Sequence, residues 1–292
     1  MRSLCLTVLS CLLFCAPAAL AQNSVLDPGA PWQGTVDMTR ASGMGGAHSA
    51  IATGNDALID NPAGIGQGRR YHFQLDGALI SKFPSQNLIF SVVDSTSIPN
   101  VGSGILFERL ASGQPGGRGE GWLAGVGYSY PVGSFYFGGM SKYVRAHGPN
   151  DDFTHQFMED IGLLSKRGDL SYSLVVRNLS LSAVPLFPLT GTVGFAYGSD
   201  ADWHLAADYK SDLSDFSNIK HTLNGGFEVL LGESFPIRFG TSWDISHHLT
   251  SLTFGGGILT QSGGIQFVYR KRVHGESGIE TMLEAGITLY LE

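Results

Sequence analysis

Residues 203–210 read Trp203-His204-Leu205-Ala206-Ala207-Asp208-Tyr209-Lys210, which puts Trp, Leu, Ala and Tyr on one side and His, Ala, Asp and Lys on the other. Residues 237–244, Ile-Arg-Phe-Gly-Thr-Ser-Trp-Asp, repeat this alternation. Successive side chains of a β-strand point to opposite faces, so a period of two predicts a sheet with one apolar and one polar surface. From about residue 70 onward, similar segments follow one another, separated by Gly, Pro, Asn, Asp or Ser. This repetition is typical of an antiparallel membrane-spanning β-barrel with a polar lumen.

The alternating segments number fourteen, which is an even count as single-chain bacterial barrels require. We place them at about 71–80, 87–94, 100–111, 120–130, 134–145, 153–166, 169–178, 189–198, 202–210, 220–231, 235–245, 249–260, 263–272 and 279–291. Connections after even-numbered strands, such as 131–133 and 199–201, are short, whereas several after odd-numbered strands, such as 112–119 and 179–188, are longer. This asymmetry predicts short periplasmic turns, longer outer loops and both termini in the periplasm.

Aromatic residues on the predicted apolar face fall near the strand ends, where a barrel meets the two membrane interfaces. Those expected at periplasmic ends are Tyr128, Tyr130, Phe135, Tyr197 and Trp203, and those expected near outer ends are Tyr209, Trp243 and Tyr269. A soluble β-sandwich with ordinary core aromatics is the alternative fold.

The first 21 residues have the features of a signal peptide. Arg2 is followed by an apolar core from 4 to 16 and by Ala19-Leu20-Ala21. A lipoprotein signal ending at Cys11 or Cys15 is the alternative. All three cysteines, Cys5, Cys11 and Cys15, lie in this segment, so we expect a mature chain without disulfides or cysteine metal sites.

Charge and composition narrow the class of protein further. Of the 18 Lys and Arg residues one is Arg2, which leaves 17 against 25 acidic residues after processing. The sequence has no run of Lys and Arg residues, so nothing in it indicates a surface that binds nucleic acid. Two stretches, 121–141 and 178–199, carry no charge and are long enough for a membrane helix. Both contain proline, glycine and a period of two, so we interpret each as a pair of strands.

Residues 22–70 differ from the rest, because they are rich in Gly, Ala, Asn, Asp and Pro and show no alternation. A short helix is expected to begin near Asn55 or Asp56, which suit an N-cap, and to end before Pro62. We interpret 22–70 as an N-terminal plug and 71–292 as the barrel.

Residues 40–47, Arg-Ala-Ser-Gly-Met-Gly-Gly-Ala, and the later Asn61-Pro62-Ala63-Gly64 resemble the N-terminal signature of one barrel superfamily. It contains FadL-type long-chain fatty-acid transporters and the PorV- and PorQ-type barrels of secretion systems. The resemblance implies a hatch that blocks the pore and a strand kink that opens a lateral exit to lipid. Its motif residues here are Gly43, Gly45, Gly46, Asn61, Pro62, Ala63 and Gly64. The chain is much shorter than FadL, which favours the partner-binding, PorV-like side of the resemblance.

Polar residues of the alternating segments are the candidates for a ligand or lumen site. They are His204, Asp208, Lys210, Asn224, Glu228, Arg238, Asp244, Gln266, Arg270 and Glu284. Glu228 with Arg238, and Arg270 with Glu284, lie on adjacent predicted strands and can pair across them. Such pairs either fill a small plugged lumen or line a path for solute.

Other residue patterns give weaker indications. His247 and His248 would point to opposite faces of a strand and have no partner at ligand spacing, so we expect no metal, and no motif indicates a cofactor. Ser246 beside His247 does not form a hydrolase constellation, and 43–46 lacks the context of a dinucleotide loop. We therefore expect no enzyme.

Apolar residues in the connection 179–188 either contact a ligand, partner or bilayer, or pack over the barrel mouth. The pairs and runs of glycine at 138–139, 225–226 and 255–257 either kink strands or ease curvature.

The last predicted strand resembles the C-terminal signal read by the barrel-insertion machinery, through Glu284, Gly286, Leu289 and Leu291, although the chain ends on Glu292 and not on an aromatic residue.

Two functions remain open. One is a passive, porin-like channel for small hydrophobic molecules in the outer membrane of a Gram-negative bacterium. The other is a structural or docking barrel that binds periplasmic or surface proteins in a machine for secretion, surface attachment or gliding. Outer-membrane lipid is an expected partner of either.

Overall fold

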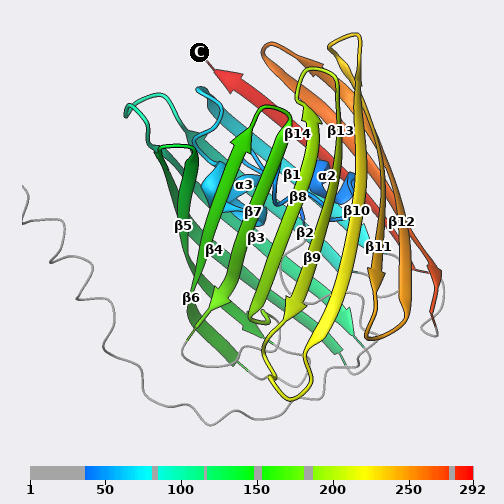
Figure 1. Cartoon of the computed structure of the whole chain (residues 1–292). Coiled ribbons are helices and arrows are strands. Elements are labelled where there is room, and N and C mark those ends of the chain that lie inside the picture. The colour runs from blue at the N-terminus through cyan, green and yellow to red at the C-terminus, as the bar shows by residue number, and fades with distance from the viewer. Residues whose placement is uncertain are drawn as a thin grey trace, which may run out of the picture.

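The computed structural model describes residues 37–80, 85–114, 117–147, 153–180, 187–275 and 280–291. Its fourteen antiparallel strands close into a single barrel (Figure 1), which confirms the predicted fold class and strand number. Each strand pairs with its neighbours in sequence, and β1 pairs with β14 to close the sheet. The predicted signal peptide and the first part of the predicted plug lie outside the described residues.

The strand boundaries agree closely with those expected from the alternation. They are β1 Tyr71–Ile80, β2 Ser85–Asp94, β3 Gly102–Gln114, β4 Gly117–Val132, β5 Phe135–His147, β6 Phe153–Arg167, β7 Leu170–Leu179, β8 Thr190–Ser199, β9 Trp203–Asp212, β10 Lys220–Leu231, β11 Phe235–Asp244, β12 Leu249–Thr260, β13 Gly263–His274 and β14 Thr281–Leu291. The uncharged stretch 121–141 contains most of β4 and the start of β5, which confirms the predicted pair of strands. The stretch 178–199 contains β8 and only the last two residues of β7. Among the described residues no helix has the length and apolarity to cross a membrane.

Three short helical segments precede the barrel, and they lie inside it (Figure 1). They are α2 Thr39–Gly43, α3 Ala57–Asp60 and the 3₁₀ turn η1 Pro62–Gly64. The α3 helix begins after Asp56 and ends before Pro62, as expected, although the Asp56 side chain forms no capping hydrogen bond. No residue pattern predicts α2, because a five-residue helix is too short to show a periodicity.

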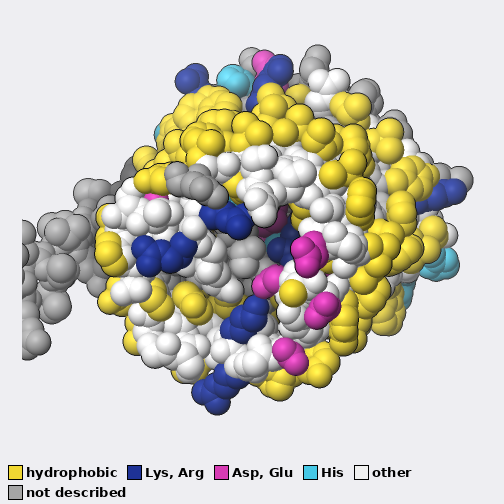
Figure 2. All heavy atoms as spheres, turned by 90° about the horizontal axis from the view of Figure 1, so that it is seen from above, with side chains coloured by type: hydrophobic (Ala, Val, Ile, Leu, Met, Phe, Trp, Pro, Cys, Tyr) yellow, Lys and Arg dark blue, Asp and Glu magenta, His cyan; other side chains and the backbone are white. Residues whose placement is uncertain are grey.

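Along each strand of the barrel wall, side chains alternate between exposed and buried, as the sequence period of two predicts. In β14, Leu283, Ile287 and Leu289 are 57, 48 and 55 % exposed, whereas the intervening Glu284 and Thr288 are buried. Within the described residues, the large exposed apolar side chains therefore cover the outside of the barrel. Seen from the end where β14 terminates, hydrophobic side chains surround a rim that carries charged groups around a central hollow (Figure 2). All eight predicted interface aromatics are exposed on this outer face.

The core of the molecule is the N-terminal segment packed against the inner wall. Met38, Leu58 and Ile65 are fully buried, together with Leu123 and Met140 of the wall. Burying a side chain of this size contributes about 1.5–3 kcal/mol. The barrel is thus filled by residues 37–66 and is no open tube.

Candidate functional site

Residues 37–66, the described part of the N-terminal segment, are called the plug below. Glycines of the plug and of the barrel wall let the two lie in close contact. Gly45 has a φ of +70° and lies against the backbone of Thr241, where a Cβ would come within 2.6 Å of the amide nitrogen. A Cβ added to Gly226 would lie 2.8 Å from the Cβ of Met44, closer than real Cβ contacts allow. On the opposite wall Gly138 faces Pro62 and Ala63 in the same way. The glycines at 138 and 226 therefore make room for the plug, which is neither of the two roles expected for them.

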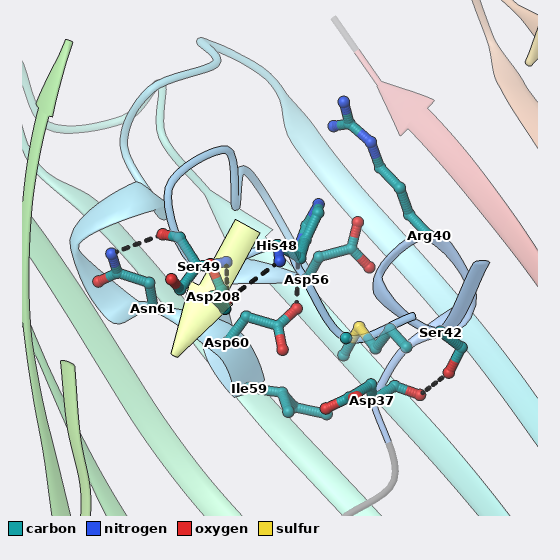
Figure 3. Close-up of polar contacts among 12 residues, drawn as sticks. Asp37, Arg40, Ser42, His48, Ser49, Asp56, Ile59, Asp60, Asn61 and Asp208 are labelled. Atoms are coloured by element: carbon teal, nitrogen blue, oxygen red, sulfur yellow. Dashed lines mark hydrogen bonds and ion pairs between the residues drawn. The ribbon is translucent and has the colours of Figure 1, made fainter. Parts of the chain in front are cut away.

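Asn61 stabilises the Asn61–Gly64 part of the plug through hydrogen bonds of its side chain. Its Oδ1 accepts from the amide of Ala63 at 3.1 Å, and its Nδ2 donates to the carbonyl of Ser49 at 2.9 Å. The side chain is fully buried, so these bonds replace its contacts with water. Asn61 thereby closes the turn into η1 and ties it to the preceding loop (Figure 3).

An ionic network joins the plug to one end of the wall. Glu228 accepts from the Arg40 guanidinium, with 2.6 Å to Nη2, and also pairs with Arg238. Arg238 donates from Nη1 to Gln266 at 2.6 Å. Arg40 reaches further to Asp200 at 3.5 Å, on the exposed turn between β8 and β9. A carboxylate between two guanidiniums in a buried setting is stabilised only while both cations stay in place.

A second polar cluster joins the middle of the plug to β9. Asp208 accepts from the amides of His48 and Ser49, at 3.1 and 2.9 Å, and the His48 ring nitrogen Nδ1 lies 2.9 Å from Asp60 (Figure 3). Burial lowers the pKa of His48 to about 4, so its imidazole is neutral at pH 7. Burial likewise raises the pKa of Asp60 well above its usual range. The cluster therefore holds the plug mainly through hydrogen bonds.

Most residues predicted from the sequence for the lumen lie on the inner face of the wall and contact the plug or each other, whereas Asp244 pairs with His247 in the turn after β11. His204, Asp208, Asn224, Glu228, Arg238, Gln266 and Glu284 are buried, whereas Lys210, Asp244 and Arg270 are partly exposed. Asn224 donates to the carbonyl of Gly46 at 3.2 Å. The expected pairing of Arg270 with Glu284 is wrong, because the register of β13 and β14 sets Arg270 opposite Met282 and Glu284 opposite Val268.

Several inward-facing charges were missed. Lys142 of β5 pairs with Asp160 of β6 at 2.7 Å, and Arg177 of β7 donates to the carbonyl of Ile59 at 3.1 Å. Asp76 of β1 accepts from the amide of Thr39 at 3.1 Å. All of these lie in segments where the period of two could have identified them, because each alternates with outward apolar side chains.

A cavity of about 50 Å³ lies between the plug, the last residues of β7 and the first residues of β8. Its large apolar lining residues are Leu58 and Ile59 of the plug, Leu106, Leu123 and Met140 of the wall, and Phe187. Its charged lining residues are Asp37, Lys142, Asp160, Arg177 and Lys210. Phe187 is buried, as expected if the connection packs over the mouth, whereas Val184 and Leu186 of that connection lie outside the described residues. The cavity is therefore amphipathic and closed on one side by the plug.

The histidine region has no arrangement for catalysis or metal binding among the described residues. His247 Nδ1 lies 2.7 Å from Asp244, so Asp244 interacts with the turn between β11 and β12 and not with the lumen network. The neighbouring Ser246 hydroxyl instead accepts from the amide of His221 at 2.9 Å. Within the described chain no group of three or more His, Cys, Asp or Glu residues is arranged to hold a metal ion.

Comparison with protein-family models and with curated proteins gives no match to this sequence. Solved structures do match. The Ralstonia pickettii toluene transporter TbuX has a TM-score of 0.67 and 14 % identity, over 89 % of this chain and 98 % of that one. The monoaromatic hydrocarbon channel CymD has a TM-score of 0.64 and 11 % identity, over 87 % and 96 % of the two chains. A Pseudomonas aeruginosa FadL homologue has a TM-score of 0.63 and 11 % identity, over 89 % and 98 %. The protein therefore has the β-barrel fold of the FadL-type channels.

Proposed function

We propose that the protein is a passive outer-membrane channel for small hydrophobic molecules. The observation that carries the proposal is the cavity against the plug, whose lining includes Leu106, Leu123 and Met140. Ligand sites are mostly apolar hollows with a few polar groups. The likeness to barrels described as toluene transporters and hydrocarbon channels supports the same conclusion.

The size of the cavity implies that a ligand must move part of the protein. An apolar cavity that holds benzene measures about 150 Å³, whereas this one measures about 50 Å³. Phe187 is the largest apolar side chain that lines the cavity, so we propose that its displacement makes room for a ligand. Passage then consists of entry past Phe187, a stay against Leu123 and Met140, and exit around the plug or through the wall.

We further propose that residues 1–21 direct export and are removed, and that the chain lies in the outer membrane of a Gram-negative bacterium with both termini in the periplasm. Most connections of two or three residues lie at the end where β14 terminates, as expected for the periplasmic side. The connection 112–119, predicted to be a longer loop at the other end, is instead mostly part of β3 and β4, which leave two residues between them. Lipid covers the outer face, and the insertion machinery is the partner during assembly. No step of this function requires a catalytic residue or a cofactor.

One observation favours the docking function as a second candidate. The plug is held by the close approach of wall glycines to Met44 and Pro62 and by the Arg40–Glu228 pair. A plug fixed on so many sides suits a barrel that serves as a scaffold for protein partners. Such a barrel would form stable complexes with envelope proteins and would not take up hydrocarbons.

Uptake with a matched pair of variants on β4 distinguishes the two functions. Leu123→Trp fills the cavity, and Val126→Trp places the same side chain on the outer face, where Val126 is 59 % exposed. Cells that produce each variant in a deletion strain are given radiolabelled toluene. We expect uptake to fall at least fivefold with Leu123→Trp and to stay within twofold of wild type with Val126→Trp. Equal uptake by the deletion strain and the wild type would reject the channel.

A further inference from the structure

A second, smaller cavity adjoins the amphipathic cavity inside the barrel. It measures about 30 Å³, and three residues, Asp37, Arg177 and Lys210, line both cavities. Its described lining contains no large apolar residue and is completed by Gly46, Ser49, Asp60, Thr192, Asp208 and Asn224. We call it the polar cavity. A molecule in the amphipathic cavity thus has a polar space next to it.

Three side chains that line these cavities carry hydrogen-bonding atoms without a partner. Thr192 Oγ1 and Asn224 Oδ1 in the polar cavity, and Thr190 Oγ1 in the amphipathic cavity, form no hydrogen bond with any described residue. All three side chains are more than nine-tenths buried. Thr190 and Thr192 are two residues apart on β8 and therefore share its inner face. A buried polar atom without a partner is costly, so a bound molecule that forms hydrogen bonds here gains affinity.

The hydrogen bond of Asn224 indicates what such a molecule must supply. Its Nδ2 donates to the carbonyl of Gly46 at 3.2 Å, so the other polar atom of the amide is the oxygen, which can only accept. The hydroxyl groups of Thr190 and Thr192 both donate and accept. A ligand that supplies a donor is therefore favoured, and a hydroxyl group suits all three side chains.

The charges around the two cavities are balanced, which argues against a charged ligand. The described lining carries three cations, on Lys142, Arg177 and Lys210. Apart from Asp60, whose pKa is raised by burial, it carries three carboxylates, on Asp37, Asp160 and Asp208. Lys142 and Asp160 form an ion pair of 2.7 Å. A ligand carboxylate would thus meet no surplus of positive charge, and a ligand ammonium group no surplus of negative charge.

From the adjoining cavities and their unpaired atoms we propose that the ligand is a small, neutral, hydrophobic molecule that carries a hydroxyl group, such as a phenol. The inference rests on the proposed channel function and names its substrate class. The apolar part of the ligand lies in the amphipathic cavity, and its hydroxyl enters the polar cavity beside Thr192 and Asn224. The polar cavity has room for about two waters, which is enough for one hydroxyl group.

A pair of threonine variants separates recognition of the hydroxyl from a general effect on the barrel. Thr192→Val removes an unpaired hydroxyl and keeps the branched shape of the side chain. Because Thr192 Oγ1 has no partner among the described residues, the change breaks no hydrogen bond between plug and wall that the structure describes. Thr288→Val is the matched control, since Thr288 is also buried on the inner face, on β14, but lines neither of the two cavities.

Equilibrium dialysis of the full-length processed barrel in a non-ionic detergent tests the proposal, with protein-free micelles as the reference. The radiolabelled probes are toluene, p-cresol and p-toluate, which share a methyl-substituted ring and differ at the position opposite the methyl group. We expect the wild type to bind p-cresol at least tenfold more tightly than toluene or p-toluate. Thr192→Val is expected to lose at least threefold in affinity for p-cresol and to stay within twofold of wild type for toluene. Thr288→Val should stay within twofold for both.

Equal affinity of the wild type for toluene and p-cresol would overturn the proposal and leave the channel for apolar molecules standing. Tighter binding of p-toluate than of p-cresol would also overturn it, because the site would then select a carboxylate. So would an undiminished affinity of Thr192→Val for p-cresol, or an equal loss for toluene, since neither result reflects recognition of a hydroxyl group. If the barrel binds none of the three probes, the channel proposal fails together with this inference.

Discussion

At the scale of single residues, the glycines of the wall decide whether the plug fits. Gly226 and Gly225 are neighbours on β10 and point to opposite sides of the sheet. A Cβ on Gly226 would collide with Met44, whereas a Cβ on Gly225 would meet only the Thr241 methyl at 3.6 Å, an ordinary contact. Overpacking of a tight interior costs about 1–3 kcal/mol.

We therefore expect Gly226→Ala to loosen the plug, and Gly225→Ala to leave it in place. Limited proteolysis of the folded barrel measures this directly, because an undocked plug exposes residues 37–66 to cleavage. Cleavage of the plug should be at least fivefold faster in Gly226→Ala than in Gly225→Ala. Equal rates would contradict the assignment of Gly226 as a docking position.

The residues of the site were predictable only in part. Glu228 and Arg238 follow from the period of two and from adjacency of their strands, and the register does set them opposite each other. The role of Arg40 could not be inferred, because its contact to Glu228 joins positions 188 residues apart and depends on how the plug folds inside the barrel. The predicted pairing of Arg270 with Glu284 is wrong for a similar reason, because it depends on the register of β13 and β14. Arg270 lies opposite Met282, two positions from Glu284.

At the scale of elements, the strands were predicted well because each is defined locally. Alternation and turn residues lie within one strand and its hairpin, so no knowledge of the rest of the chain is needed. The plug is different. Its helices α2 and α3 have five and four residues, too few for a helical period, and they are fixed by contacts with the surrounding wall.

The closing strand β14 carries the proposed insertion signal. Leu289 and Leu291 are 55 and 53 % exposed on the lipid face, while Gly286 faces the plug near Thr39 and Asp76. We expect Leu289→Asn/Leu291→Asn to slow assembly, because it removes the two apolar side chains that the machinery and the bilayer would meet. Leu283→Asn, on the same face but at the other end of β14, is the control.

Pulse-labelled cells give the measurement, as the fraction of each variant that shows heat-modifiable migration after a chase. The account predicts at least a threefold lower folded fraction at early times for the double variant than for Leu283→Asn. If the two variants assemble at the same rate, the C-terminal position of these leucines has no special role.

At the scale of the whole molecule, the barrel combines a lipid-facing exterior with an interior that is largely occupied. The plug explains why inward glycines and polar residues are frequent, because it needs both close approach and hydrogen-bond partners. The remaining cavity of about 50 Å³ makes ligand passage dependent on movement of a side chain or of the plug. The fold and the filled interior therefore agree with the proposed channel, which would open only through such a movement.

The central claim is that lipid covers the outer face of the strands. Because all three cysteines of the sequence precede residue 22, single cysteines can be placed in the processed chain and spin-labelled without background. Labels at 205, 206, 207, 208 and 209 of β9, in lipid vesicles, report collisions with oxygen and with a water-soluble nickel chelate. If lipid covers this face, oxygen accessibility is high at 205, 207 and 209 and low at 206 and 208. Equal accessibility at all five positions, or preferential contact of 205, 207 and 209 with the nickel chelate, would contradict it.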